Sequence, residues 1–267
     1  MNDLILQRIT KLPTLPESFT KIESVYHNPK ATFKDMADIV QSDPLLTADI
    51  LKAANSALYG FSHEVRSINK AVSLFGMGTV RGFAMASVVK HSFELDMSAY
   101  GISNDEFADM SGLLNAVAVL CYMKKDPSIL DLLSPATFLV EMGKVLISHY
   151  IIKENLVDRF SEALKTRSSI QEAEREVAGT TTVKVSAALF KYWKFDRDLV
   201  DVIENADMPQ NAKMQNRQAA EILKCLRTAV TLNATLTTKS VEEATRQMKQ
   251  YGLDTQCLES VAQDIKV

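Results

Sequence analysis

Residues 42–60 read SDPLLTADILKAANSALYG, and this stretch predicts a capped amphipathic helix. Asp43 can accept hydrogen bonds from the free N–H groups of a first helical turn, and Pro44 lacks the N–H that would be unsatisfied there. Behind them, apolar residues recur at steps of three and four, as on one face of an α-helix. They are Leu46, Ile50, Leu51, Ala54 and Leu58. We therefore expect a helix that begins at Pro44 and buries one side.

Similar cap signals predict helices along the rest of the chain. A hydroxyl followed three residues later by a carboxylate has the spacing of a capping box. These pairs are Thr32 with Asp35, Ser103 with Glu106, and Ser240 with Glu243. Ser134 and Pro135 repeat the arrangement of Asp43 and Pro44 and should open another helix. With only 9 Gly and 7 Pro and almost no β-branched alternation, the chain is predicted to be all-α.

The segment ELDMSAYGIS, residues 94–103, is the clearest break in the helical pattern. It is short, and it carries Gly101 and several small polar residues between two long helical patterns. We therefore predict an N-terminal helical lobe over residues 1–95 and a second helical lobe over residues 96–267. A chain of 267 residues is long enough for two lobes, and a linker of this length allows them to pack on one another.

The composition is that of an ordinary globular protein, with 46% hydrophobic residues, 24% charged residues and a formal net charge of -3. Acidic residues are interspersed among the basic ones without an aromatic ladder, so no nucleic-acid partner is expected. Nucleic-acid binding would require a basic face that net charge does not reveal. The sequence has no secretory signal pattern, and no run reaches the roughly 18 apolar residues of a membrane helix. We expect a cytoplasmic protein without a membrane partner.

The three cysteines are Cys121, Cys225 and Cys257, which are far apart in the sequence and form no CxxC pair. An odd number of widely spaced cysteines predicts neither a disulfide framework nor a thiolate zinc site. A reducing compartment fits this pattern.

The four histidines are His27, His63, His91 and His149. No two of them have the three- or four-residue helical spacing that would let them bind one metal ion, so no histidine-rich metal site is predicted. His149 lies on an apolar stripe and is expected to be a hydrogen-bonded core or rim residue. The GMG at residues 76–78 follows a helical pattern and is expected to be a helix C-cap. Neither a phosphate-binding loop nor a GxSxG elbow is present.

A resemblance to a known family rests on motif residues in a fixed order. These are Asp43, Pro44, Asn55, Ser56, Tyr59 and Gly60, preceded by LPTLPES at residues 12–18 and followed by VRSINKAVSLFGMGTVRGFAM at residues 65–85. They resemble the N-terminal part of the HDOD family, bacterial signalling domains related to HD phosphohydrolases. The resemblance covers roughly residues 10–210 and implies a helical bundle packed on a helical half built like an HD domain.

Two interpretations of Asn55 and Ser56 follow from their place near the end of an amphipathic helix. Polar side chains at such a place compete for the backbone's own hydrogen bonds. They either end the helix and bind the next loop, or they form a contact surface with the segment FSHEVRSINKA.

The resemblance also implies that the metal site of HD enzymes is lost. TFLVEMGK, residues 137–144, is similar to the HD segment GLLHDIGK, which places Val140 and Glu141 where the metal-binding His-Asp pair would be. The other ligand positions fall on Thr182, Ala206, Asp207 and Val230. Valine cannot coordinate a metal, and glutamate displaces the carboxylate by one methylene. If Glu141 is buried, we expect it to face an arginine, a lysine or a backbone N–H.

We therefore expect a non-catalytic bacterial signal-transduction module that needs no cofactor or metal and acts through contacts with a protein partner. Asp43, Asn55, Ser56 and Tyr59 would set the geometry of the contact face. The alternative is a divergent metal-dependent phosphohydrolase or nucleotide-binding protein. In that case Glu141 and Asp207, with other carboxylates, would hold Mg²⁺ or Mn²⁺, since oxygen ligands alone suit these hard ions.

Overall fold

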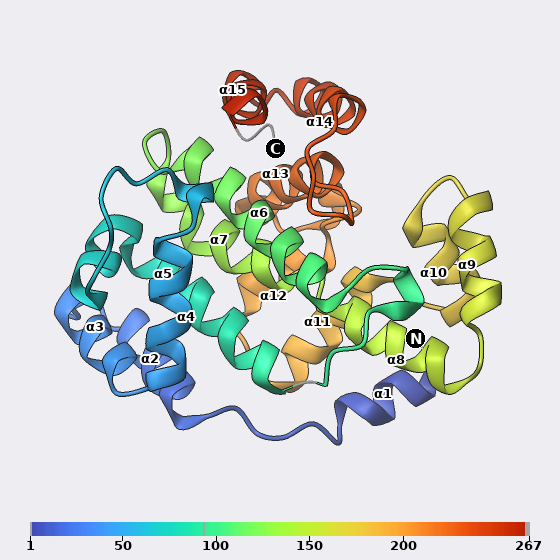
Figure 1. Ribbon diagram of the computed structural model, residues 1–267, viewed down its shortest axis with the longest axis horizontal. Helices are drawn as coiled ribbons and strands as arrows, with labels where there is room; N and C mark the ends of the chain where they lie inside the picture. Colours follow the sequence, from blue (N-terminus) through green and yellow to red (C-terminus); the bar gives the residue numbers. More distant parts are fainter. Residues whose placement is uncertain (1, 93, 265–267) are drawn as a thin grey trace.

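The computed structural model describes residues 2–92 and 94–264, and within these ranges the chain folds into helices joined by turns and loops (Figure 1). The prediction of an all-α fold is confirmed. The described residues form no β-strand, and one isolated antiparallel bridge joins Val230 and Leu236. The α-helices are α1 (Asp3–Ile9), α2 (Glu17–Tyr26), α3 (Phe33–Gln41), α4 (Pro44–Ala54), α5 (Ile68–Ser92), α6 (Asn104–Tyr122), α7 (Leu130–Leu139), α8 (Gly143–Lys153), α9 (Val157–Thr166), α10 (Ile170–Ala178), α11 (Thr182–Tyr192), α12 (Arg197–Glu204), α13 (Arg217–Ala229), α14 (Thr238–Gln250) and α15 (Gln256–Asp264). Short 3-10 turns are η1 (Ala57–Tyr59), η2 (Ser98–Tyr100), η3 (Pro127–Ile129), η4 (Pro209–Asn211) and η5 (Met214–Asn216).

Three of the predicted helix starts are confirmed. Helix α4 begins at Pro44, and the Asp43 carboxylate accepts hydrogen bonds from the N–H groups of Leu45 and Leu46, both at 3.1 Å. Thr32 and Ser103 cap α3 and α6 through the capping boxes that their spacing predicts. Local chemistry alone determines these ends, because the capping groups lie within one turn of each other.

Two predicted helix starts are wrong. Pro135 lies inside α7, which begins at Leu130, and it packs so closely on α5 that a Cβ added to Gly82 would lie 3.0 Å from the Pro135 nitrogen. Tertiary packing there compensates for the N–H that proline lacks. Helix α14 begins three residues before the predicted start and is capped by Thr237, with Ser240 as the third helical residue.

The GMG segment marks a kink rather than a helix end. Gly76 has a φ of 76° inside α5, a conformation that glycine adopts without strain, and the helix resumes directly after it. The prediction that a helix ends at this glycine is borne out to the extent that Gly76 is non-helical and separates two helical segments, the second of which follows directly.

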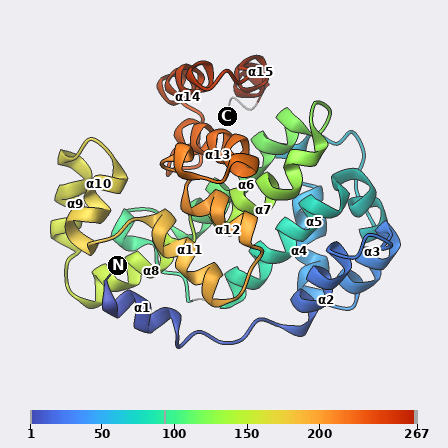
Figure 2. The ribbon, with the colours of Figure 1, turned by 180° about the vertical axis from the view of Figure 1, so that it is seen from behind.

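Helices α2 to α5 form one side of the molecule, and α8 to α12 lie on the other side of α6 and α7 (Figures 1 and 2). Helix α5 packs along α7, and the two approach closely at Gly78 and Gly82. The first helix does not stay with its sequence neighbours, because α1 packs on α8 and α11. The segment between α1 and α2 passes along one edge of the molecule, where Tyr192 donates a hydrogen bond to the Thr10 carbonyl and Trp193 donates one to the Pro13 carbonyl.

One described helix is long and apolar enough to cross a membrane by length and composition. This stretch, Ile68–Val88 of α5, is 72% buried inside the protein, as expected for a central core helix.

A disulfide joins Cys121 on α6 to Cys257 on α15, so the prediction that the cysteine spacing gives no disulfide is wrong. The two residues are 136 positions apart, and only the packing of α15 on α6 brings them together. Cys225 is a buried free cysteine.

Candidate functional site

The segment TFLVEMGK forms the tight turn between α7 and α8. Gly143 begins α8 against α11, and an added Cβ would lie 2.2 Å from the Thr182 carbonyl oxygen. Ser186 on α11 accepts a hydrogen bond from the Gly143 N–H and donates one to the Val140 carbonyl. Because the turn is held on both sides of Glu141, that side chain has a fixed direction into the protein.

Glu141 is buried and paired with two cations, as expected for a buried carboxylate. Its Oε1 lies 2.5 Å from Nε of Arg227, and its Oε2 lies 2.8 Å from Nζ of Lys144, although the latter contact lacks hydrogen-bond geometry. Burial alone would raise the pKa of Glu141, but the charges of Arg227 and Lys144 outweigh it and lower the pKa to about 2. Glu141 is therefore an ionised group with its charge already neutralised.

Lys144 joins Glu141 to a second buried carboxylate, that of Glu174 on α10. Nζ of Lys144 lies 3.3 Å from Oε1 of Glu174 and 3.1 Å from Oγ1 of Thr182. Burial would lower the pKa of Lys144, but Glu141 and Glu174 together raise it above its usual value. The ammonium is thus charged and enclosed by oxygen atoms from three side chains.

Glu174 is fully buried and its two oxygens accept several hydrogen bonds. Donors to it are the N–H of Thr182 at 2.6 Å, the hydroxyl of Thr182 at 2.5 Å and the hydroxyl of Tyr100 at 2.9 Å. Burial, together with the charge of Glu174, raises the pKa of Tyr100 well above its usual value, so Tyr100 remains a proton donor. Each oxygen of this carboxylate has a defined partner.

Arg227 on α13 binds a second carboxylate besides Glu141, that of Asp207. Its Nη1 lies 2.5 Å from Oδ1 of Asp207, whose side chain is 25% exposed. We call Glu141, Lys144, Glu174, Asp207 and Arg227 the buried ion-pair network. Three carboxylates face two cations in it, and within the described ranges no group of three or more His, Cys, Asp or Glu residues has an arrangement that could hold a metal ion.

The predicted ligand positions divide into two groups. Glu141, Thr182 and Asp207 belong to or touch the ion-pair network, so the structure brings them together. Val140, Ala206 and Val230 are buried apolar side chains and supply no ligand. Each of these three side chains belongs to the hydrophobic core.

Sequence reasoning missed Lys144 as a charged partner, along with Glu174, Arg227 and Tyr100. The pairing of Lys144 with Glu141 had a local signal, because residues three apart share a helical face. Arg227 had none, since it is 86 positions from Glu141 and meets it only through the packing of α13.

A polar cavity of about 960 Å³ lies beside the ion-pair network. We call it the polar cleft. Glu141, Lys144, Asp207 and Arg227 form part of its wall, and α13, α14 and the segment between them supply hydroxyl and amide groups. These include Thr228, Thr231, Asn233, Thr237 and Gln247.

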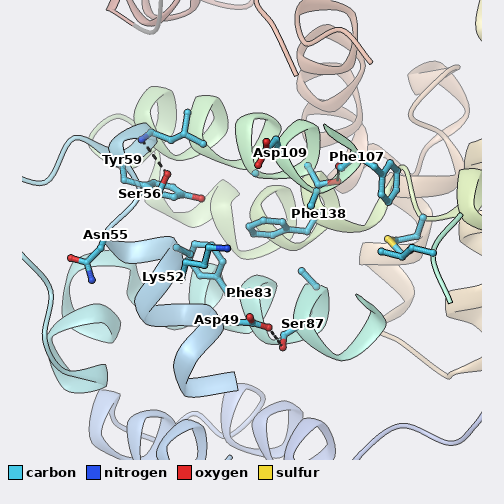
Figure 3. A pocket seen from close by; sticks show the side chains of 18 residues that line it. Asp49, Lys52, Asn55, Ser56, Tyr59, Phe83, Ser87, Phe107, Asp109 and Phe138 are labelled. Carbon is cyan, nitrogen blue, oxygen red and sulfur yellow. Dashed lines mark hydrogen bonds between the residues drawn. The ribbon is translucent and has the colours of Figure 1, made fainter. Parts of the chain in front are cut away.

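A second cavity, of about 510 Å³, lies between the two predicted lobes and has a mostly apolar wall (Figure 3). We call it the interlobe groove. Its apolar wall is formed by Leu58 of η1, Phe83 of α5, Phe107 of α6 and Phe138 of α7, together with Met142. Charged groups line it at Asp49 and Lys52 on α4 and at Asp109 on α6. Asp49 accepts a hydrogen bond of 2.6 Å from the Ser87 hydroxyl, as Figure 3 shows.

Three of the family-motif residues, Asn55, Ser56 and Tyr59, line this groove and also hold its walls in place, whereas Asp43, Pro44 and Gly60 are outside its lining. Asn55 caps the end of α4, donates hydrogen bonds to the Leu51 and Val65 carbonyls, and accepts one from the Val65 N–H. Ser56 caps η1, and Gly60 ends it in the left-handed conformation with a φ of 61°. The first interpretation of Asn55, that it ends the helix and binds the next loop, matches these contacts.

Tyr59 connects the two sides of the groove. Its buried hydroxyl donates a 2.8 Å hydrogen bond to Oδ1 of Asn115 on α6. The Asn115 amide nitrogen in turn donates to the hydroxyls of Ser134 and Thr137 on α7. Tyr59 thereby ties η1 to α6 and α7, which form the opposite wall.

His149 occupies a rim position, and its Nε2 donates a hydrogen bond to the Glu94 carbonyl. This contact agrees with the prediction of a hydrogen-bonded core or rim residue.

Comparison with known proteins gives matches at the level of both sequence and fold. A relative from Treponema pallidum, described as an uncharacterized protein, is 32% identical over 73 residues, which span 27% of this chain and only 14% of that relative. A solved virulence factor from Campylobacter jejuni is 26% identical, with a TM-score of 0.60 over 97% of this chain and 95% of that one.

Two other solved structures share the fold at lower identity. An HDOD domain protein of unknown function from Geobacter sulfurreducens is 16% identical, with a TM-score of 0.69 over 98% of this chain and 93% of that one. A protein from Shewanella amazonensis, provisionally described as a phosphohydrolase, is 22% identical, with a TM-score of 0.69 over 99% and 95%. The model of the HDOD domain matches residues 12–209, most of the chain, and the chain therefore belongs to the HDOD domain family.

Proposed function

We propose that this HDOD protein is a non-catalytic signal-transduction module that acts through contacts with a protein partner. The observation that carries the proposal is the buried ion-pair network. Lys144 and Arg227 neutralise the carboxylates that a divalent metal ion would need at the position of an HD metal site. A metal ion would have to displace two charged groups that are themselves buried, and an uncompensated buried charge is costly.

The imidazole ligands of an HD site are also replaced. Valine, threonine and alanine stand at Val140, Thr182 and Ala206, and the Thr182 hydroxyl is bound to Glu174. Oxygen ligands remain at Glu141 and Asp207, but both share the guanidinium of Arg227. The site is therefore suited to holding α8, α10, α11 and α13 together rather than to activating water.

The interlobe groove is the surface that we assign to the partner. Its volume lies in the range of specific binding sites, and its wall is apolar with a few charged groups at the edge. An apolar wall flanked by Asp49 and Asp109 fits an amphipathic helix whose basic side chains face these two carboxylates. Lys52 between them would favour one acidic residue on that helix.

The experiment compares a blocked groove with an intact one in affinity purification after chemical cross-linking in the native organism. Ala108→Trp places a large side chain on the groove from an exposed position of α6, and Lys184→Trp adds the same side chain on exposed α11 as a control. We expect Ala108→Trp to lower enrichment of the partner by about tenfold, as for a central contact residue, while Lys184→Trp retains it. Equal enrichment with both variants would exclude the groove as the partner site.

The polar cleft favours a second candidate function, that of a divergent metal-dependent phosphohydrolase or nucleotide-binding protein. Its hydroxyl and amide groups lie beside Glu141 and Asp207, and its volume is sufficient for a nucleotide. Stoichiometric Mg²⁺ or Mn²⁺, together with nucleotide hydrolysis that Glu141→Ala abolishes, would establish this function in place of the first.

A further inference from the structure

The C-terminal helix α15 has few non-covalent attachments. It packs on α6 and α14, and Leu258 and Val261 are its buried side chains. Next to it, Lys125 and Asp254 form an ion pair whose side chains are 53% and 42% exposed, and such pairs contribute little. The disulfide between Cys121 and Cys257 is therefore the strongest tie between α15 and the rest of the molecule.

The three cysteines differ in their access to small reagents. Cys257 is partly exposed, and with Cys121 it lines a small surface depression that also contains Lys125 and Asp254. Cys225 is fully buried, and burial raises the pKa of its thiol to about 12. Reagents in solution can therefore reach Cys257, whereas Cys225 is both buried and held in the unreactive thiol form.

We propose that Cys121 and Cys257 form a reversible redox modification site whose disulfide holds α15 on α6. The co-reactant is a low-molecular-weight disulfide. The Cys257 thiolate attacks one of its sulfur atoms, forms a mixed disulfide and releases one small thiolate. The Cys121 thiolate then attacks the Cys257 sulfur and releases the second. Two protein thiols thus lose two electrons and two protons, the small disulfide becomes two thiols, and a dithiol reverses the reaction.

Reduction has a consequence for the polar cleft. Helix α15 packs on α14, and α14 with its cap supplies Gln247 and Thr237 to the cleft wall. When the disulfide opens, the described part of α15 keeps its packing through Leu258 and Val261 but loses its covalent link to α6, so α14 loses a fixed neighbour. The redox state of one cysteine pair thereby controls the order of one wall of the cleft. This site is independent of the partner groove, which involves neither α14 nor α15.

The test uses the full-length protein treated with glutathione disulfide or with dithiothreitol under native conditions. Alkylation after unfolding, read by mass spectrometry, should find one free thiol in the oxidised protein and three in the reduced protein. Hydrogen exchange of the α15 amides should be about tenfold faster or more after reduction, whereas exchange in α5 and α7 should not change. Reoxidation should restore the slow exchange.

Two variants distinguish an effect of the Cys121–Cys257 disulfide from general effects of the reagents on the protein. Cys257→Ser should show the fast exchange of α15 under both conditions, and Cys225→Ala should respond to reduction as the wild type does. The proposal is overturned if glutathione disulfide leaves three free thiols, if dithiothreitol opens the disulfide only after unfolding, or if α15 exchanges equally in both states.

Discussion

The buried ion-pair network and the interlobe groove lie in the same helical fold but use charge in opposite ways. In the network, the cations of Lys144 and Arg227 are buried and face carboxylates within hydrogen-bonding distance. In the groove, the wall is apolar and the charged groups of Lys52 and Asp109 are exposed at its edge. The first arrangement is complete within the chain, whereas the second leaves groups for another molecule to contact. The comparison teaches that the same helices can pair buried charges with one another at one place and leave charged groups exposed beside an apolar wall at another.

The largest expected effect comes from removing one cation of the network. Arg227→Met leaves Glu141 and Asp207 without their shared partner, and breaking a buried ion pair costs about 3–5 kcal/mol. The free energy of unfolding, measured in urea, should fall by that amount. Lys125→Met, which removes an exposed partner of Asp254, is the control and should change it by less than about 1 kcal/mol. Similar values for the two variants would contradict the role assigned to the network.

The second-largest effect is expected from acid, which weakens the buried ion-pair network by protonating Glu141. The pKa of Glu141 in the folded protein is about 2, below the ordinary value of 4.5, so its contribution is complete above pH 4.5. It is lost as the pH falls from 4.5 toward 2, and its full size is about 3 kcal/mol. Unfolding free energy measured between pH 6 and pH 2.5 should decline more steeply in the wild type than in Glu141→Gln. Parallel curves would show that Glu141 is not the group that titrates.

Adding a single methyl group at Gly143, in the turn formed by TFLVEMGK, should lower the stability by a smaller amount. Gly143→Ala would place a Cβ 2.2 Å from the Thr182 carbonyl oxygen, and overpacking of this kind costs about 1–3 kcal/mol. Gly112→Ala on α6 is the matched control, because the nearest atom to its Cβ is a Leu58 methyl group at 4.0 Å. Thermal unfolding should show a lower midpoint for Gly143→Ala only. A loss of stability in Gly112→Ala of the same size would contradict this difference.

The smallest effect is expected at the hydrogen bond that crosses the groove. Tyr59→Phe leaves the buried Oδ1 of Asn115 without its donor, which costs about 1–2 kcal/mol. Because the apolar ring stays in place, the variant should remain folded and lose partner binding only if the groove changes shape. Urea unfolding checks the first expectation, and the cross-linking experiment checks the second. Unchanged unfolding free energy would mean that water replaces the tyrosine hydroxyl.

The parts of the fold that sequence predicted are those with local causes. Asp43 with Pro44, Thr32 with Asp35, and Ser103 with Glu106 act within one helical turn, and all three helix starts are found. Pro135 predicts a helix start, but it lies inside α7, where it packs closely against α5. No sequence window contains that information.

For the buried ion-pair network, the sequence predicted what kind of partner Glu141 needs but not which residues supply it. A buried glutamate at position 141 requires a cationic or N–H partner, and the structure supplies Lys144 and Arg227. The lysine lies one turn away, but Arg227 is brought in by α13, whose packing the hydrophobic pattern does not specify. The Cys121–Cys257 disulfide is a stronger example of a contact that sequence could not predict, because its two cysteines are 136 residues apart and their spacing carries no signal.

The most direct test of the central claim is the metal content of the protein after equilibration with Mn²⁺ and removal of free ions. If Lys144 and Arg227 occupy the place of the metal ions, the wild type should retain no stoichiometric Mn²⁺, and Glu141→Ala should give the same result. Stoichiometric Mn²⁺ in the wild type that is lost in Glu141→Ala would contradict the account and establish a working metal site.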